Sequence, residues 1–269
     1  MKKSNVLLLC FNLFSTINVC KGYVYYGISR RLITTYLDNN KITTNVNNNN
    51  AYNNDSNMRY SYVRKRYMSK KKSNEHDNEK YINDVMYQWV KQFVWGLQLC
   101  PFSGSVIADN KMNIKVINDD DSNKGLQNIF DYIIEESNII SISNKESKYT
   151  TTLVVLSSSS WNDFHNYLQL VEDVENLLTS TKLDESIQIA TFHPNYVFAE
   201  TDDDSVENFT NRSPYPCLHL LKVEEVTKAI ESYGDTQNIY ENNIKKMHSL
   251  GLEKIQQINE KIKNEALKK

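Results

Sequence analysis

The sequence predicts an α/β fold with a single domain built on a small, mostly parallel sheet, and three observations support this fold class. Three short β-prone segments, at residues 112–116, 151–156 and 187–192, alternate with two amphipathic helical patterns, which is the order of a βαβαβ core. The middle segment is continuously β-prone, as expected of a strand that is covered on both faces. No internal repeat and no second break in composition follows Lys72. The alternative is a ferredoxin-like α+β arrangement.

We expect five helical segments around these strands, at about residues 79–99, 119–134, 160–178, 223–233 and 235–250, followed by a charged helical tail from about residue 252. Pro101 ends the first helix, because the residue before a proline avoids the helical region. Asp119–Asp121 begins the second helix, where carboxylates suit the helix dipole. Ser160 and Asp163 have capping-box spacing for the third.

The chain before this domain differs from it in composition. Residues 1–20 carry two lysines, then an apolar core, then small and polar residues, which is the layout of a signal peptide. Residues 21–72 hold eleven Lys/Arg against two acids and are rich in Asn, so we expect residues 21–74 to be a disordered, basic transit segment. Such a leader resembles those that direct proteins through the secretory route into a plastid of the apicoplast type. The alternative is a secreted protein with an Asn-rich spacer.

Charge and cysteine content narrow the function of the remaining domain, residues 75–269. From residue 73 onward the chain has 18 Lys/Arg and 31 Asp/Glu, a net charge of −13. This acidic balance repels phosphate backbones, so we expect no nucleic-acid partner. The two cysteines outside the leader, Cys100 and Cys217, form no CxxC pair, which favours a reducing compartment. We expect no membrane span in the mature protein, and the cofactor remains unknown because no dinucleotide or P-loop glycine motif occurs.

The carboxyl ends of the three predicted strands should lie at one edge of the sheet, because crossovers between parallel strands are right-handed. That edge would present Asp119–Asp121, His193 and the serine turn, which consists of Ser157, Ser158, Ser159 and Ser160. Ligands of open α/β sheets bind outside the carboxyl ends of strands. The sequence therefore predicts a site at this edge, with the serine turn as a possible anion-binding segment at a helix start.

Two residues next to prolines are candidates for catalysis. His193, followed by Pro194, ends the third strand and titrates near neutral pH, so we expect it to act as a general acid or base. Alternatively, it is hydrogen-bonded to the backbone of a turn. Cys100, followed by Pro101, is a candidate nucleophile or partner of His193. Its alternative role is packing, because large apolar residues surround it.

Arg212 is the only arginine after Arg66. A guanidinium group captures carboxylate or phosphate with two hydrogen bonds, so Arg212 is a candidate anion clamp. The alternative is a salt bridge that fixes the loop. Either role gains from the neighbouring residues that restrict or support the backbone, which are Asn211, Ser213, Pro214, Tyr215 and Pro216.

His219 lies in an apolar run, where a histidine is usually a satisfied core residue. It is the second candidate partner of His193 in catalysis. Cys100, His193 and His219 could together ligate zinc, but their spacing is long and irregular, so we predict no metal site.

Three motifs carry a family resemblance: LxLCPF at residues 97–102, FHPxYxF at residues 192–198 and NRSPYPxLHLL at residues 211–221. On these motifs the chain resembles the uncharacterised family known as domain of unknown function 1415, over about residues 78–252. Members often continue the last motif with Arg-Glu, where this chain has Lys222-Val223-Glu224. The resemblance implies an ancient single-domain protein of bacterial type, which fits import into a plastid, and implies no activity.

Two functions follow from the sequence as hypotheses. The first is an enzyme acting on a small anionic substrate, with Arg212 and the serine turn binding the anion and His193 transferring protons. The second is a non-catalytic binding or assembly protein of the organelle with a protein partner. An enzyme of this kind requires Cys100, His193, His219 and Arg212 to lie around one pocket, whereas a binding protein leaves them apart or buried in hydrogen-bond networks.

Overall fold

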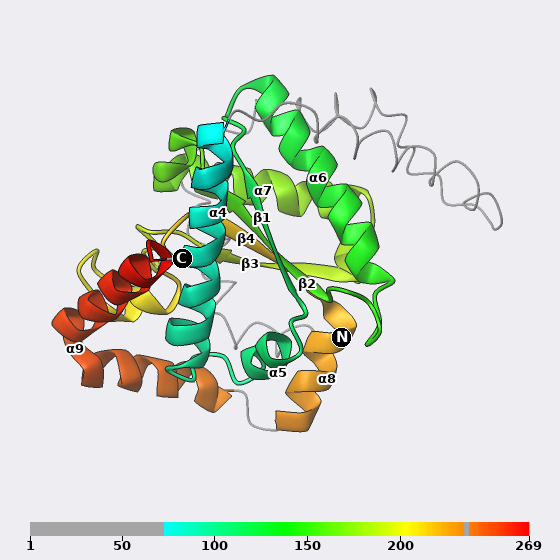
Figure 1. The fold of residues 1–269 in the computed structure, drawn as a ribbon. Helices are drawn as coiled ribbons and strands as arrows, with labels where there is room; N and C mark the ends of the chain where they lie inside the picture. Colours follow the sequence, from blue (N-terminus) through cyan, green and yellow to red (C-terminus); the bar gives the residue numbers. More distant parts are fainter. Residues whose placement is uncertain (1–72, 234–236, 269) are drawn as a thin grey trace, which may run out of the picture.

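The computed structural model describes residues 73–233 and 237–268, which form one sheet with helices on both faces (Figure 1). The predicted signal and transit segments lie outside the described residues, apart from the last two residues of the latter. Among the described residues, none of the helices is both long and apolar enough to cross a membrane.

The sheet has four strands and is mixed, so the prediction of a mostly parallel sheet is wrong. The strands are β1 (Met112–Ile117), β2 (Thr151–Leu156), β3 (Ile187–Phe192) and β4 (Cys217–Lys222), in the order β1-β2-β4-β3. The three predicted strands are confirmed, and β1 and β2 pair in parallel. The strand missing from the prediction, β4, inserts antiparallel to both β2 and β3. A ferredoxin-like order is also excluded, because the chain reads βαβαββ and its first two strands are parallel neighbours.

Each crossover helix packs on the same face of the sheet. Helix α6 (Asn123–Ser141) joins β1 to β2, and α7 (Phe164–Ser180) joins β2 to β3. Their buried side chains form one core with Leu218 and Leu220 of β4. Because both faces of the sheet are covered here, every residue of β2 is buried, and its last four residues are apolar.

The opposite face of the sheet carries the first and last helices. Helix α4 (Ser73–Gln88) continues as a π-helical segment, η2 (Trp89–Trp95), and packs beside α9 (Gln237–Ala266), as Figure 1 shows. The second core contains Cys217 and Phe192 from the sheet. The predicted single helix over residues 79–99 is therefore present, but it widens into π geometry at Trp89 and ends at Trp95.

Helix α9 bends at Gly251, whose φ of 70° interrupts the helical backbone. The segment after this bend was expected as a charged tail. It packs into the second core through Ile255, Ile262 and Ala266, all of which are buried. The remaining helical segments are α5 (Ser103–Ala108), η3 (Ser159–Asn162), η4 (Leu183–Glu185), η5 (Val206–Thr210) and α8 (Val223–Tyr233).

The helix starts differ by a few residues from the prediction. Helix α7 is capped by Asp163, whose carboxylate accepts from the backbone N–H of Asn166 at 2.9 Å, and not by Ser160. Helix α6 is capped by Ser122. Asp120 supports this cap by accepting from the hydroxyl of Ser122 at 2.5 Å. Both helices therefore begin with a side chain that accepts from one backbone N–H of the first turn.

Candidate functional site

His193 lies at the carboxyl edge of the sheet, but backbone groups occupy both of its ring nitrogens. Its Nδ1 accepts from the backbone N–H of Asn195 at 3.0 Å, so Nε2 carries the hydrogen and donates to the carbonyl oxygen of Trp161 at 2.9 Å. The side chain is fully buried. Burial lowers the pKa of His193, with the bond to Trp161 acting in the opposite direction. The ring is therefore neutral near pH 7 and has the contacts of a residue that fixes a turn.

Aromatic rings enclose His193 on the α7 face of the sheet. The rings of Phe164 and Tyr167 each lie 5.0 Å from the imidazole, measured between centroids. Tyr196 packs on Phe164 in turn, at 5.3 Å. This apolar shell explains the burial that disfavours the charged imidazole.

His219 lies on the other face of the sheet. On β4, Leu218 and Leu220 point into the core of α6 and α7, whereas Cys217 belongs to the core of α4 and α9. Because side chains alternate along a strand, His219 shares the α4/α9 face with Cys217. The hydroxyl of Thr151 donates to the carbonyl of Leu220 at 2.7 Å, so it accepts from Nε2–H of His219 at 2.7 Å. Burial lowers the pKa of His219 to about 4.

The sheet therefore separates the two histidines that were expected to act together. His193 is enclosed by α7 residues, and His219 faces away from them. No group of three or more His, Cys, Asp or Glu side chains suited to a metal ion occurs within residues 73–233 and 237–268. The alternative zinc set of Cys100, His193 and His219 is accordingly not assembled.

Arg212 has the contacts of a residue that stabilises a loop. Its Nε donates to the carbonyl oxygen of Tyr196 at 3.0 Å, and one terminal nitrogen donates to that of Asp203 at 2.6 Å. The guanidinium also lies over the ring of Phe209, 4.8 Å from its centroid. The side chain is half-buried, and burial lowers its pKa while Asp203 raises it. Arg212 thus joins three parts of the loop between β3 and β4. Its hydrogen bonds go to backbone carbonyl groups, and not to a carboxylate as the salt-bridge alternative required.

The supporting residues around Arg212 bond within this loop and to the end of β3. Asn211 is buried and donates to the carbonyl of Thr191 at 3.2 Å. The hydroxyl of Ser213 donates to the carbonyl of Tyr215 at 2.6 Å. Asn208, which the sequence did not single out, accepts from Phe198 N–H and the Thr201 hydroxyl and donates to the carbonyl of Asp202. The loop motif is therefore an internal hydrogen-bond network.

The serine turn lies at the predicted edge of the sheet, beside the carboxylate of Asp121. Ser160 donates to the carboxylate of Asp121 at 3.1 Å, and Trp161 donates its indole N–H to the carbonyl of Asp119 at 2.8 Å. Ser157 donates to the carbonyl of Ile117 at 3.3 Å, and the hydroxyl of Ser158 accepts from Ser160 N–H. Ser159 is exposed. An anion placed here would meet the negative charges of residues 119–121, so the electrostatics oppose an anion site.

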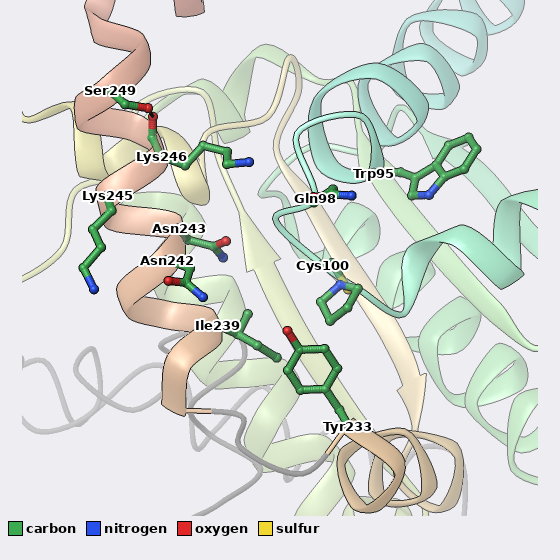
Figure 2. A pocket seen from close by; sticks show the side chains of 11 residues that line it. Trp95, Gln98, Cys100, Tyr233, Ile239, Asn242, Asn243, Lys245, Lys246 and Ser249 are labelled. Atoms are coloured by element: carbon green, nitrogen blue, oxygen red, sulfur yellow. Dashed lines mark hydrogen bonds between the residues drawn. The ribbon is translucent and has the colours of Figure 1, made fainter.

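A cleft lined by Cys100 and Pro101 lies away from the serine turn, His193 and Arg212. It has a volume of about 710 Å³ and opens between α9 and the turn that joins η2 to α5 (Figure 2). Its lining residues are Trp95, Gln98, Cys100, Pro101, Tyr233, Ile239, Asn242, Asn243, Lys245, Lys246 and Ser249. Cys100 and Pro101 are the two sequence-predicted residues in this set.

The turn that carries Cys100 has an uncommon backbone. Gln98 adopts a φ of 56°, in the left-handed region that residues other than glycine rarely enter. Asn243 of α9 holds this turn by donating to the carbonyl of Leu99 at 2.9 Å. Cys100 itself is mostly buried, and its carbonyl accepts from the hydroxyl of Ser103 at 2.7 Å. Two side chains therefore hold this wall of the cleft by donating hydrogen bonds to its backbone carbonyl groups.

The two lysines of the cleft differ in their surroundings. Lys246 is half-buried, and Figure 2 shows its side chain extending from α9 toward Gln98. Lys245 is exposed and points away from the turn, with its amino group 3.6 Å from the carboxylate of Glu241. None of the described residues that line the cleft is acidic. The cleft is thus a positive site in a domain whose net charge is negative.

The α9 residues of the cleft were not predicted from the sequence. Asn242, Asn243 and Lys246 lie in a polar helix segment, and such residues usually face solvent. The left-handed residue Gln98 gives no local signal either, because glutamine does not favour that conformation. The available signal was Cys100 beside Pro101, which marked one wall of the cleft.

A family model described as "Protein of unknown function (DUF1415)" matches residues 81–257. No curated protein and no solved structure matches the chain.

Proposed function

Because the chain belongs to the DUF1415 family, whose description names no activity, we propose from the geometry that it binds a small anionic ligand in the cleft between α9 and the Cys100 turn. Lys246 supplies the positive charge. The amide groups of Gln98, Asn242 and Asn243 supply hydrogen bonds. The ligand would lie against Cys100.

The charge of the lining carries this proposal. The chain from residue 73 onward has a net charge of −13, which lowers the concentration of anions near its surface. Two lysines and no acids line the cleft among the described residues, so the local potential opposes that of the whole domain. Lys246 is half-buried, where water screens its charge less than at an exposed position.

Two backbone features support the same location. Seven residues of π-helix immediately precede the turn, and π-helical segments are frequent at functional sites. The left-handed backbone of Gln98 follows within a few residues, and such strained residues cluster at binding sites.

The enzymatic form of the hypothesis rests on Cys100. This cysteine lines the cleft, whereas His193, His219 and Arg212 do not. An acid–base role for His193 and an anion clamp at Arg212 would require them to give up the backbone bonds described above. Ligand binding in the cleft leaves these backbone hydrogen bonds in place, so a binding function is better supported than an enzymatic one.

Lysine variants provide the test. Lys246→Met and Lys245→Met remove the same charge from adjacent positions of one helix, but Lys246 extends toward Gln98, whereas Lys245 points away from the turn and lies beside Glu241. Isothermal titration with acetate, citrate and inorganic phosphate should show binding that Lys246→Met weakens at least tenfold and Lys245→Met weakens less than threefold. Equal losses in both variants would indicate general electrostatics, and the proposal would then fail.

A protein-binding role is the second candidate, and the end of α6 favours it. Ile139 and Ile142 are 47% and 83% exposed, although isoleucine is among the most often buried residue types. A partner that covers these side chains would be retained by the wild-type chain and by Ile142→Leu, and lost by Ile142→Asp. Proximity labelling in the source cell with these three forms tests the role.

We also propose import into a plastid of the apicoplast type, on the composition of residues 1–74. A fluorescent protein carrying residues 1–74 should reach the plastid. With residues 1–20 alone it should be secreted. Secretion of both fusions would support the alternative of a secreted protein.

A further inference from the structure

We infer that the ligand is an amphipathic monoanion, a carboxylate that bears an apolar chain or ring, and that the apolar part lies between Tyr233, Ile239 and Pro101. This inference rests on the proposed function and names the class of ligand for the same cleft. It comes from the distribution of polar and apolar side chains along the cleft.

The lining is divided along the axis of α9. Figure 2 shows the polar side chains of Lys246, Ser249 and Gln98 toward one end, with the ring of Trp95 beside Gln98, and Tyr233 and Ile239 toward the other end. Ten residues separate Ile239 from Ser249, which corresponds to about 15 Å along a helix. A ligand that contacts both ends must therefore be elongated, with unlike ends.

The apolar end has a rigid support. The ring of Tyr233 packs edge-on against Phe102 at a centroid distance of 5.9 Å. Ile239 is buried in a small cluster with Ile230, against which Phe102 also packs. Tyr233 nevertheless remains 47% exposed, and it borders the cleft. An apolar group in the cleft would remove part of that ring surface from water, which favours binding.

The polar end matches one negative charge. Lys246 is the half-buried cation of the cleft, while Lys245 is exposed and already near Glu241. A dianion such as phosphate would bring a second charge with no matched cation, and burying an unpaired charge is unfavourable. A monocarboxylate instead uses Lys246 for its charge and the neighbouring amide and hydroxyl groups for its remaining lone pairs.

The test is a titration of the full chain with acetate, butanoate, hexanoate and octanoate, and with inorganic phosphate. We expect the affinity to rise about fourfold for each added methylene that the apolar end covers. Tyr233→Phe should keep this rise, and Tyr233→Ser should reduce it to less than twofold per methylene. Tyr149→Ser is the matched control, because Tyr149 does not line the cleft, and it should behave as wild type.

The outcomes separate this inference from the proposed function. If phosphate and all carboxylates bind with similar affinity and still depend on Lys246, the ligand class is wrong and the anion site stands. If chain length matters equally in Tyr233→Ser, the apolar part lies elsewhere and the inference is overturned. If none of the five anions binds, both the inference and the proposed function fail.

Discussion

The phenol of Tyr167 donates a hydrogen bond of 2.8 Å to the carbonyl oxygen of Cys217, at the point where β3 and β4 begin to separate. The phenol oxygen of Tyr167 in turn accepts from the backbone N–H of Phe192 at 3.1 Å. Phe192 and Cys217 are paired in register, so a side chain from α7 bridges the last pair of the two strands. Burial raises the pKa of Tyr167, which keeps the phenol protonated and able to donate.

Replacing Tyr167 by Phe should therefore destabilise the fold. The variant keeps the ring but leaves a buried donor and a buried acceptor without a partner, at a cost of about 1–3 kcal/mol. Urea denaturation followed by circular dichroism measures this change. Tyr149→Phe, in a surface loop, is the control and should differ from wild type by less than about 0.5 kcal/mol. A similar small effect at Tyr167 would mean that the bridge contributes little.

The stability of the domain should fall as the pH drops from about 6.5 to about 4. The pKa of His219 is lowered by burial from 6.5 in the unfolded chain to about 4 in the fold. The unfolded state therefore binds more protons within this window, and the free energy of unfolding decreases with decreasing pH, by up to about 1.4 kcal/mol per pH unit for one such histidine. Above pH 6.5 this contribution is fully present.

Denaturation of wild type and His219→Leu at several pH values between 4 and 7.5 checks this expectation. In the variant, the free energy of unfolding should depend less steeply on pH. Part of the remaining dependence should come from His193, because its pKa is lowered as well. Equal slopes in the two proteins would show that His219 does not titrate in this window.

Gly125→Ala should disrupt the start of α6. A β-carbon at this position would lie 2.3 Å from the backbone oxygen of Asp120, which cannot move without shifting the helix cap. We expect a loss of about 2–3 kcal/mol in the free energy of unfolding. Gly251→Ala is the comparison, because no heavy atom lies within 4 Å and only the φ of 70° opposes the side chain, at about 1 kcal/mol. A smaller loss at Gly125 than at Gly251 would contradict this reasoning.

Arg212→Lys should weaken the loop between β3 and β4 and leave anion binding in the cleft unchanged. Lysine keeps the charge but cannot donate to two carbonyl groups in different directions while lying flat on Phe209. We expect a loss of about 1–2 kcal/mol, with faster hydrogen exchange in residues 194–216. Loss of anion affinity without loss of stability would instead support the clamp that the sequence suggested.

Much of the fold was predictable because its signals are local. The apolar run of β2 and the stripes of α6 and α7 are set by burial on one or both faces, and each appears within a few neighbouring residues. β4 was missed for the opposite reason. Its six residues follow Pro216, contain His219 and run directly into α8, so neither alternation nor turn residues marked them as a strand. The interior place of β4 depends on pairing with segments about 30 and 65 residues away.

The site was predictable only in part. Cys100 and Pro101 were named from their local pattern, but their partner wall comes from α9. The hydrogen bond from Asn243 to the carbonyl of Leu99 joins residues 144 positions apart, and a periodic pattern in the sequence does not predict such a long-range contact. For Arg212, a rigid setting was inferred from the prolines, whereas its two carbonyl acceptors depend on how the loop folds back on itself.

The cleft draws every one of its lining residues from the helical layer and from the turns of that layer, and none from the strands. The proposed ligand contacts and the pairing of the strands thus depend on separate sets of side chains. Substitutions at the exposed lining positions of α9 should therefore change the proposed ligand contacts without altering the strand register.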